Sequence, residues 1–322
     1  MIRSKSIFSI VIILVFLIAD NLELKNILPG GYYFRSTVIY LAPAIIGMFS
    51  LFFFHEPRNI LSAMGIQKGF FKGLGIAFVF TLPMLIGYAW VSGVGVNEIV
   101  SEMNFRKIYW GIILAPLAEE LFYRGFLFGQ LFRFGGWGFI PAGLLSALIF
   151  GSMHLYQAND FGSAVGVFAI TGMGGMWFAW LYIEWGKNLW LSIFLHFFMN
   201  CYWGIFGMAN NAAGGFYANL FRTITIIVSV IATYYLHKKI GKKEINKSTL
   251  WVNQNSDFAL KTFFSKNKII LKTGLLALVF IFFQNQNFAQ NNFTAGTIFN
   301  EKNEPLSYVN IGIVGTSLGT VS

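Results

Sequence analysis

Eight long apolar segments occupy most of the first 236 residues of this chain. A helix that crosses a bilayer needs about 20 mostly apolar residues, and each segment reaches or approaches that length. The segments lie near residues 6–20, 36–54, 70–93, 108–132, 138–156, 161–183, 188–208 and 216–236. Charged residues make up only 11% of the chain, against about 25% in soluble proteins, so most of the surface cannot face water. The sequence predicts an all-α, polytopic membrane helix bundle of about eight transmembrane helices.

The basic residues predict the orientation of this bundle. With the N-terminus inside, twelve Lys and Arg residues fall at cytoplasmic ends and four in outside loops, in agreement with the positive-inside rule. The twelve are Arg3, Lys5, Arg58, Lys68, Lys72, Arg133, Lys187, Lys238, Lys239, Lys242, Lys243 and Lys247, and the four are Lys25, Arg35, Arg106 and Lys107. We therefore expect an integral membrane protein with a cytoplasmic N-terminus.

The formal net charge of +10 is concentrated in one region. Residues 237–272 hold nine Lys residues against Glu244 and Asp257. A basic segment that follows a membrane helix on the cytoplasmic side attracts anionic lipid headgroups. We expect membrane lipid as a partner and no nucleic acid. The single cysteine, Cys201, excludes a disulfide framework and any multi-cysteine metal site.

The chain changes character after the eighth apolar segment. We divide it into a membrane domain at 1–236, a basic cytoplasmic linker at 237–265, a signal-peptide-like segment at 266–290 and a β-prone tail at 291–322. A basic start, an apolar run and an Ala before a possible cleavage site are typical of a secretory signal peptide. The tail alternates like short strands and resembles the opening strands of the carboxypeptidase-regulatory-like β-sandwich found ahead of outer-membrane receptors.

Two interpretations of this C-terminal part remain open. In the first, residues from about 264 onward are the start of a second, secreted protein joined to a membrane protein, which indicates a bacterial cytoplasmic membrane. In the second, the apolar run forms a ninth helix with a short external tail.

Few ionisable or amide side chains fall inside the predicted membrane spans. Ionisable residues there cost at least about 2.5 kcal/mol each on insertion scales, and they are functional candidates for that reason. Away from the ends of the spans, only two of the 13 acidic residues and two of the four histidines lie within them. The embedded polar residues are Glu119, Glu120, Arg124, His154, His196 and Asn200. Because they occur on only three apolar segments, we expect one convergent site.

The spacing of these residues predicts which side chains meet. Neighbouring helical residues point about 100° apart, so Glu119 and Glu120 are not expected to face the same point. Glu120 and Arg124 are four residues apart and can form an ion pair along the helix. The Glu119 carboxylate then stays unpaired and available for a chemical role. The same spacing places Asn200 on the face of His196, and Phe150 one turn before His154.

Three motifs in this order resemble a known family. Residues 119–124 fit a Glu-Glu-x-x-x-Arg pattern, residues 150–154 fit Phe-x-x-x-His, and residues 196–200 fit His-x-x-x-Asn. Together they resemble the CAAX protease and bacteriocin-processing (CPBP, or Abi) family, which includes the type II CAAX prenyl endopeptidases. The motif-bearing core covers residues 108–204.

The resemblance implies an intramembrane, glutamate-dependent endopeptidase without a metal cofactor. Glu119 and His154 would hold and activate the attacking water, and His196 and Asn200 would stabilise the oxyanion. The supporting residues implied by the motifs are Glu120, Arg124 and Phe150. The substrate class would be a membrane-associated or prenylated protein or peptide.

Three alternatives stay open from the residues themselves. Glu119, His154 and His196 also match the ligand set of a catalytic zinc site with one open position. Glu and His residues in helices form proton relays in transporters. A non-catalytic membrane protein, such as a bacteriocin-immunity protein, would retain the same fold.

Overall fold

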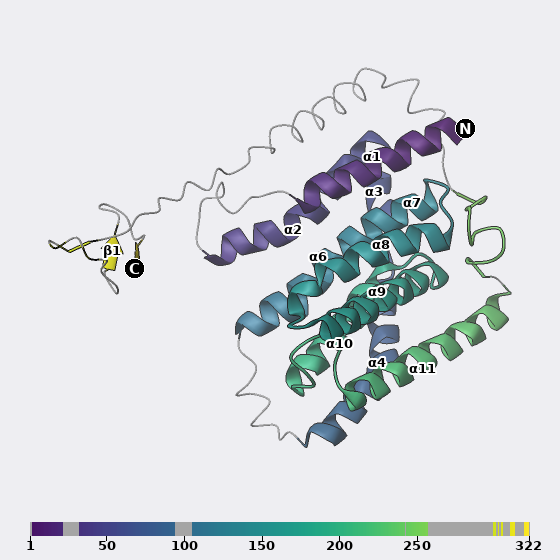
Figure 1. The fold of residues 1–322 in the computed structure, drawn as a ribbon. Coiled ribbons are helices and arrows are strands. Elements are labelled where there is room, and N and C mark those ends of the chain that lie inside the picture. Colours follow the sequence, from purple (N-terminus) through teal and green to yellow (C-terminus); the bar gives the residue numbers. More distant parts are fainter. Residues whose placement is uncertain are drawn as a thin grey trace. The chain divides into compact units, whose positions relative to one another are not determined.

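The computed structural model describes residues 2–21, 32–93, 105–241 and 243–256, together with residues 299–300, 302, 304, 310–312 and 319–321. The chain divides into two compact units, residues 1–281 and 282–322. The regular elements in the described part of the first unit are all helices (Figure 1), and residues 243–256 form turns. Its elements are α1 (Ile2–Asp20), α2 (Tyr32–Ser50), η1 (Leu51–Phe53), η2 (Pro57–Asn59), α3 (Ile60–Met64), α4 (Phe70–Ser92), η3 (Lys107–Leu114), α6 (Ala115–Glu119), η4 (Glu120–Phe128), α7 (Gly129–Arg133), α8 (Phe139–Met153), η5 (Leu155–Gln157), α9 (Phe161–Glu184), α10 (Leu189–Ile205) and α11 (Phe216–Ile240).

Helices occupy all eight predicted spans, which confirms the all-α membrane bundle. In the part of the chain that the structure describes, five helical stretches are long and apolar enough to cross a membrane. They are Tyr33–Phe53, Phe70–Ser92, Phe139–Gln157, Phe161–Glu184 and Phe216–Ile240. The other three predicted spans correspond to α1, to the shorter apolar helix α10, and to one continuous helical run formed by η3, α6, η4 and α7.

Local sequence determines where the helices begin and end. Asp160 precedes α9, and its side chain accepts a hydrogen bond from the Ser163 backbone in a reciprocal capping box, which satisfies free N–H groups of the first turn. These hydrogen bonds from Ser163 lower the pKa of the exposed Asp160 carboxyl. At the other end of the bundle α11 stops at Gly241, whose φ of +66° belongs to the left-handed region that glycine tolerates.

The run formed by η3, α6, η4 and α7 is the central helix of the bundle. All residues from 122 to 135 are buried, although this helix carries Arg124 and Arg133. The Arg133 guanidinium donates to the backbone carbonyls of Ser62 and Ala63 and to the Tyr182 hydroxyl, so its Nη1 is hydrogen-bonded without water. Around this helix α1 packs on α2, α8 on α9, and α4 on both α10 and α11.

Residues 243–256 pack against the helical bundle, although their composition is typical of a loose linker. The first backbone N–H groups of α8 donate to this segment: Phe139 to the Thr249 carbonyl at 2.8 Å and Ile140 to the Leu250 carbonyl at 2.9 Å. Glu184, at the end of α9, accepts from the backbone N–H groups of Glu244 and Ile245. The segment therefore satisfies polar groups at the ends of two helices.

Asn253 is expected to hold this segment in place. Its side chain is buried and donates to the Phe132 carbonyl at 2.8 Å. Replacing Asn253 with Ala should lower the free energy of unfolding by about 1–3 kcal/mol, because a buried carbonyl loses its partner. The measurement is thermal or denaturant unfolding in detergent. The matched control is Gln254→Ala, because that side chain is exposed; equal stability of the two variants would contradict the expectation.

The second unit is described only in part. Strands β1 (Asn310–Gly312) and β2 (Gly319–Val321) pair antiparallel, with Ile311 opposite Thr320. This pair lies in the tail that the sequence predicts to be β-prone. The predicted signal-peptide-like segment and the end of the predicted linker lie outside the described residues, so both interpretations of residues 264 onward stay predictions.

Candidate active site

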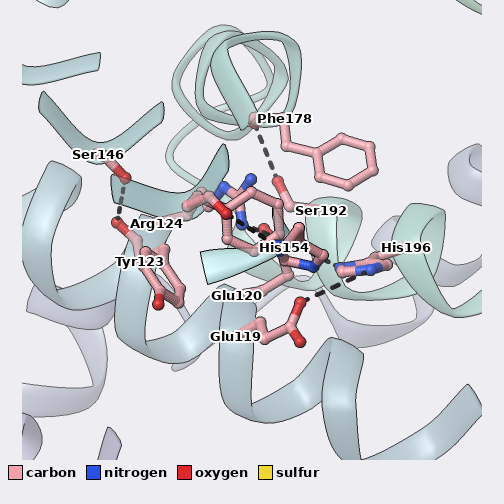
Figure 2. A network of polar contacts seen from close by, with 10 residues as sticks. Glu119, Glu120, Tyr123, Arg124, Ser146, His154, Phe178, Ser192 and His196 are labelled. Carbon is pink, nitrogen blue, oxygen red and sulfur yellow. Dashed lines mark hydrogen bonds and ion pairs between the residues drawn. The ribbon is translucent and has the colours of Figure 1, made fainter. Parts of the chain in front are cut away.

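The two glutamates of the site lie where the central helix changes its winding. Glu119 ends the α-helical segment α6, and Glu120 begins the π-helical segment η4. π-Helical turns are rare in proteins, but those that occur often lie at functional sites. The Ser146 hydroxyl of α8 donates to the Tyr123 carbonyl at 3.1 Å (Figure 2), so a neighbouring helix hydrogen-bonds to the backbone of the π-helical segment.

Glu120 and Arg124 form the predicted ion pair. Arg124 Nη1 donates to Glu120 Oε1 at 3.0 Å, and the two side chains are 1% and 0% exposed. The same Glu120 oxygen lies 3.0 Å from His196 Nδ1. Because a carboxylate accepts hydrogen bonds, His196 donates from Nδ1. Glu120 therefore links the arginine of the central helix to the imidazole of α10.

The prediction that Glu119 and Glu120 face different points is wrong. In Figure 2 a dashed line joins the Glu119 carboxyl group to the His196 ring, and Glu120 Oε1 lies 3.0 Å from Nδ1 of the same ring. His196 Nε2 lies 3.9 Å from Glu119 Oε2, whereas Nδ1 faces Glu120. The expectation assumed one regular α-helix and one target atom, but an imidazole presents two nitrogen atoms on different sides of its ring. Adjacent glutamates can thus share a single histidine.

One oxygen of the Glu119 carboxylate is available to accept a hydrogen bond. Its side chain is 22% exposed, more than those of Glu120 and Arg124. Its Oε2 is buried and has no hydrogen-bond partner among the residues that the structure describes. A buried carboxylate oxygen without a partner is costly in a folded protein. This atom is the clearest candidate for contact with a reacting group.

His154 lies at the C-terminal end of α8 as the capping residue, just beyond the last helical turn. Its Nδ1 is 2.7 Å from the Phe150 carbonyl. Because a carbonyl only accepts, Nδ1 carries the proton and the lone pair of the neutral ring is on Nε2. The Phe150 and His154 rings are 4.4 Å apart, as their four-residue spacing predicts.

Asn200 faces the central helix, as His196 does. Its Nδ2 donates to the Gly111 carbonyl of η3 at 2.8 Å. The two residues share one side of α10, in agreement with the spacing, but they contact different turns of the partner helix. One N–H of the Asn200 amide is used for this contact, and the amide group carries a second.

Aromatic rings enclose the charged residues. The Arg124 guanidinium lies 4.0 Å from the Phe150 ring centroid and 5.7 Å from that of Phe178, within the range of a cation–π interaction. Phe178 also lies 5.6 Å from the His196 ring. In Figure 2 the Ser192 hydroxyl of α10 points to the Phe178 backbone, to which it donates at 3.1 Å.

Phe178 and Tyr123 are two further residues of the site that the sequence motifs do not indicate. Tyr123 contacts the Phe150 ring at 5.0 Å, and Phe178 lies 5.6 Å from the His196 ring. Neither residue carries a sequence signal beyond an apolar position. In the described residues no group of three or more His, Cys, Asp or Glu side chains is arranged to hold a metal ion.

The fold and this site define a polytopic membrane protein with a buried carboxylate–imidazole centre. Residues 102–202 match the family model of the type II CAAX prenyl endopeptidases described as Rce1-like. This match supports the family that the three motifs resemble.

A curated bacterial protein also matches this chain. It is the "Putative membrane peptidase YdiL" of Bacillus subtilis (strain 168), 34% identical over 90 residues, which are 28% of this chain. The match covers 32% of the Bacillus protein, so the chain spans about a third of the length of that relative. No solved structure shows a significant match.

Proposed function

We propose that this protein is an intramembrane endopeptidase that hydrolyses a peptide bond of a membrane-associated or prenylated protein or peptide. The observation that carries the proposal is the Glu119 Oε2 atom, which is buried, has no hydrogen-bond partner among the described residues, and lies 3.9 Å from His196 Nε2. The Rce1-like match and the Bacillus relative support a peptidase.

Glu119 acts as the general base in this proposal. It accepts a proton from a water molecule, whose oxygen attacks the peptide carbonyl carbon to form a tetrahedral intermediate. Glu119 then returns the proton to the leaving nitrogen as the C–N bond breaks. His154 is a second acceptor for the water, because its Nδ1–H is bound to the Phe150 carbonyl and its Nε2 lone pair is available.

His196 and Asn200 supply donors for the negative charge that develops on the carbonyl oxygen. One donor is the second amide N–H of Asn200. The other is Nε2 of His196 in the doubly protonated form of its ring, in which Nδ1–H still donates to Glu120. One well-placed donor to an oxyanion contributes about 2.7–4 kcal/mol to catalysis. Glu120 holds His196 in this orientation through its 3.0 Å contact with Nδ1, and Arg124 holds Glu120 through a second 3.0 Å contact.

Metal removal discriminates this mechanism from the zinc alternative. We expect purified protein to keep its activity after dialysis against a strong chelator, because Glu119 and not a metal ion activates the water. The measurement is the cleavage rate before and after chelation, with metal content determined on the same sample. Stoichiometric zinc together with chelator-abolished and zinc-restored activity would overturn the metal-free mechanism in favour of Glu119, His154 and His196 as ligands.

The natural substrate can be found by comparing cells that carry the wild type with cells that carry Glu119→Gln. We propose that the protein lies in a bacterial cytoplasmic membrane with its N-terminus inside, so the new C-termini should belong to membrane-associated proteins or peptides. Mass spectrometry of protein termini is the measurement. Identical termini in both strains would contradict the endopeptidase proposal and favour a transport or immunity function.

A further inference from the structure

Helix α9 contributes to the site although no sequence motif lies on it. Gly175 and Phe178 are three residues apart and share one face of this helix. Phe178 contacts both the Arg124 guanidinium and the His196 ring. Gly175 lies against Arg124. The face of α9 that carries these two residues therefore forms one wall around the arginine.

A side chain at Gly175 would collide with the Arg124 guanidinium. A Cβ atom there would lie 2.8 Å from Arg124 Nη2 and 3.7 Å from both the Ala147 Cα and the Phe150 ring. Gly174, the preceding residue, has no heavy atom within 4 Å of the corresponding position. Of these two neighbouring glycines, Gly175 is buried and faces Arg124, whereas Gly174 is partly exposed.

Arg124 has little freedom to move away from an added methyl group. Its guanidinium is stacked against Phe150 at 4.0 Å, and Nη1 donates to Glu120 at 3.0 Å. The side chain is 1% exposed. A shift of Nη2 therefore moves the whole planar guanidinium, and with it the contact to Glu120.

We propose that Gly175 is a positioning residue of the active site. By having no side chain, it allows Arg124 to lie against Phe150 and to hold Glu120, and through Glu120 to orient His196. Gly175 touches no reacting group and acts through Arg124. The expected effect of Gly175 on kcat rests on the proposed function. Its expected effect on the position of Arg124 and Glu120 does not.

Gly175→Ala and its matched control Gly174→Ala test this role by kinetics. We expect Gly175→Ala to lower kcat about 10- to 100-fold, as small misplacements of catalytic groups do, with KM nearly unchanged because the substrate-facing side chains remain. Gly174→Ala should have the kcat of the wild type. Equal effects of the two substitutions, or a loss confined to KM, would overturn the proposal.

A second measurement does not depend on activity. In protein labelled with ¹⁵N in its histidine rings, Gly175→Ala should shift the His196 Nδ1 resonance, because the Glu120 contact changes, whereas Gly174→Ala should leave it in place. An unchanged resonance in both variants would overturn the proposal. If the wild type cleaves no substrate, the proposed function fails, and this spectrum still decides the role of Gly175.

Arg124→Lys provides the coupling test. Lysine lacks Nη2, so Gly175→Ala should lower kcat less in the Arg124→Lys background than in the wild type. The effects of the two substitutions on kcat should therefore be non-additive. If Gly175→Ala alone does not fold, the double variant should fold. Additive effects, or a double variant that also fails to fold, would show that the methyl group does not act through Arg124.

Discussion

Replacing Glu119 with Gln is expected to lower kcat about 10²- to 10⁴-fold, the usual contribution of a general base. Gln has nearly the same shape as Glu and preserves packing, but its amide cannot accept the proton of the attacking water. The fold should persist, because the Glu120–Arg124 ion pair and the aromatic contacts around it are untouched. The measurement is the cleavage rate of purified protein, with helix content and melting temperature determined on the same sample.

The control for this substitution is Glu56→Gln. Glu56 lies in the loop after α2, where its exposed carboxylate pairs with Arg58. This variant should cleave at the rate of the wild type. A Glu119→Gln variant that is folded and as active as Glu56→Gln would remove Glu119 from the mechanism.

Replacing Arg124 with Met is expected to lower the free energy of unfolding by about 3–5 kcal/mol, because removing one partner of a buried ion pair leaves the Glu120 carboxylate with His196 as its remaining partner. Glu120 is 0% exposed, so its carboxylate cannot turn to water. The double variant Glu120→Gln/Arg124→Met should be more stable than the single variant, because no unpaired charge remains. Unfolding in detergent measures both.

An exposed pair of the same charges serves as the control. Arg58 and Glu56 are 81% and 63% exposed, so Arg58→Met should change stability by about 0–1 kcal/mol. A loss for Arg124→Met as small as that for Arg58→Met would mean that the Glu120–Arg124 pair does not stabilise the bundle.

The helices and part of the site were predictable because their signals are local. A run of apolar residues long enough to cross a bilayer predicts a helix whatever surrounds it. Spacings of four residues predicted the Glu120–Arg124 pair and the Phe150–His154 contact, since both residues of each pair lie on one helical segment or at its end. That His196 belongs to the same site followed from the scarcity of polar residues in the spans.

Other parts of the site depend on contacts between distant segments. The approach of both Glu119 and Glu120 to His196 requires the crossing of two helices, which residue spacing within one helix does not specify. Gly175 and Phe178 are ordinary residues of an apolar helix, so nothing in their chemistry distinguishes them from packing residues. Residues 243–256 have the polar composition of a linker, but their partners are backbone groups of α8 and the Glu184 side chain.

The most direct test of the central claim is hydrolysis of one membrane substrate in proteoliposomes prepared in H₂¹⁸O. Substrates come from the comparison of protein termini in wild-type and Glu119→Gln cells. We predict that the wild type produces a new C-terminus that carries ¹⁸O, that Glu56→Gln does the same, and that Glu119→Gln produces almost none. Cleavage by Glu119→Gln at the rate of the wild type would contradict the account.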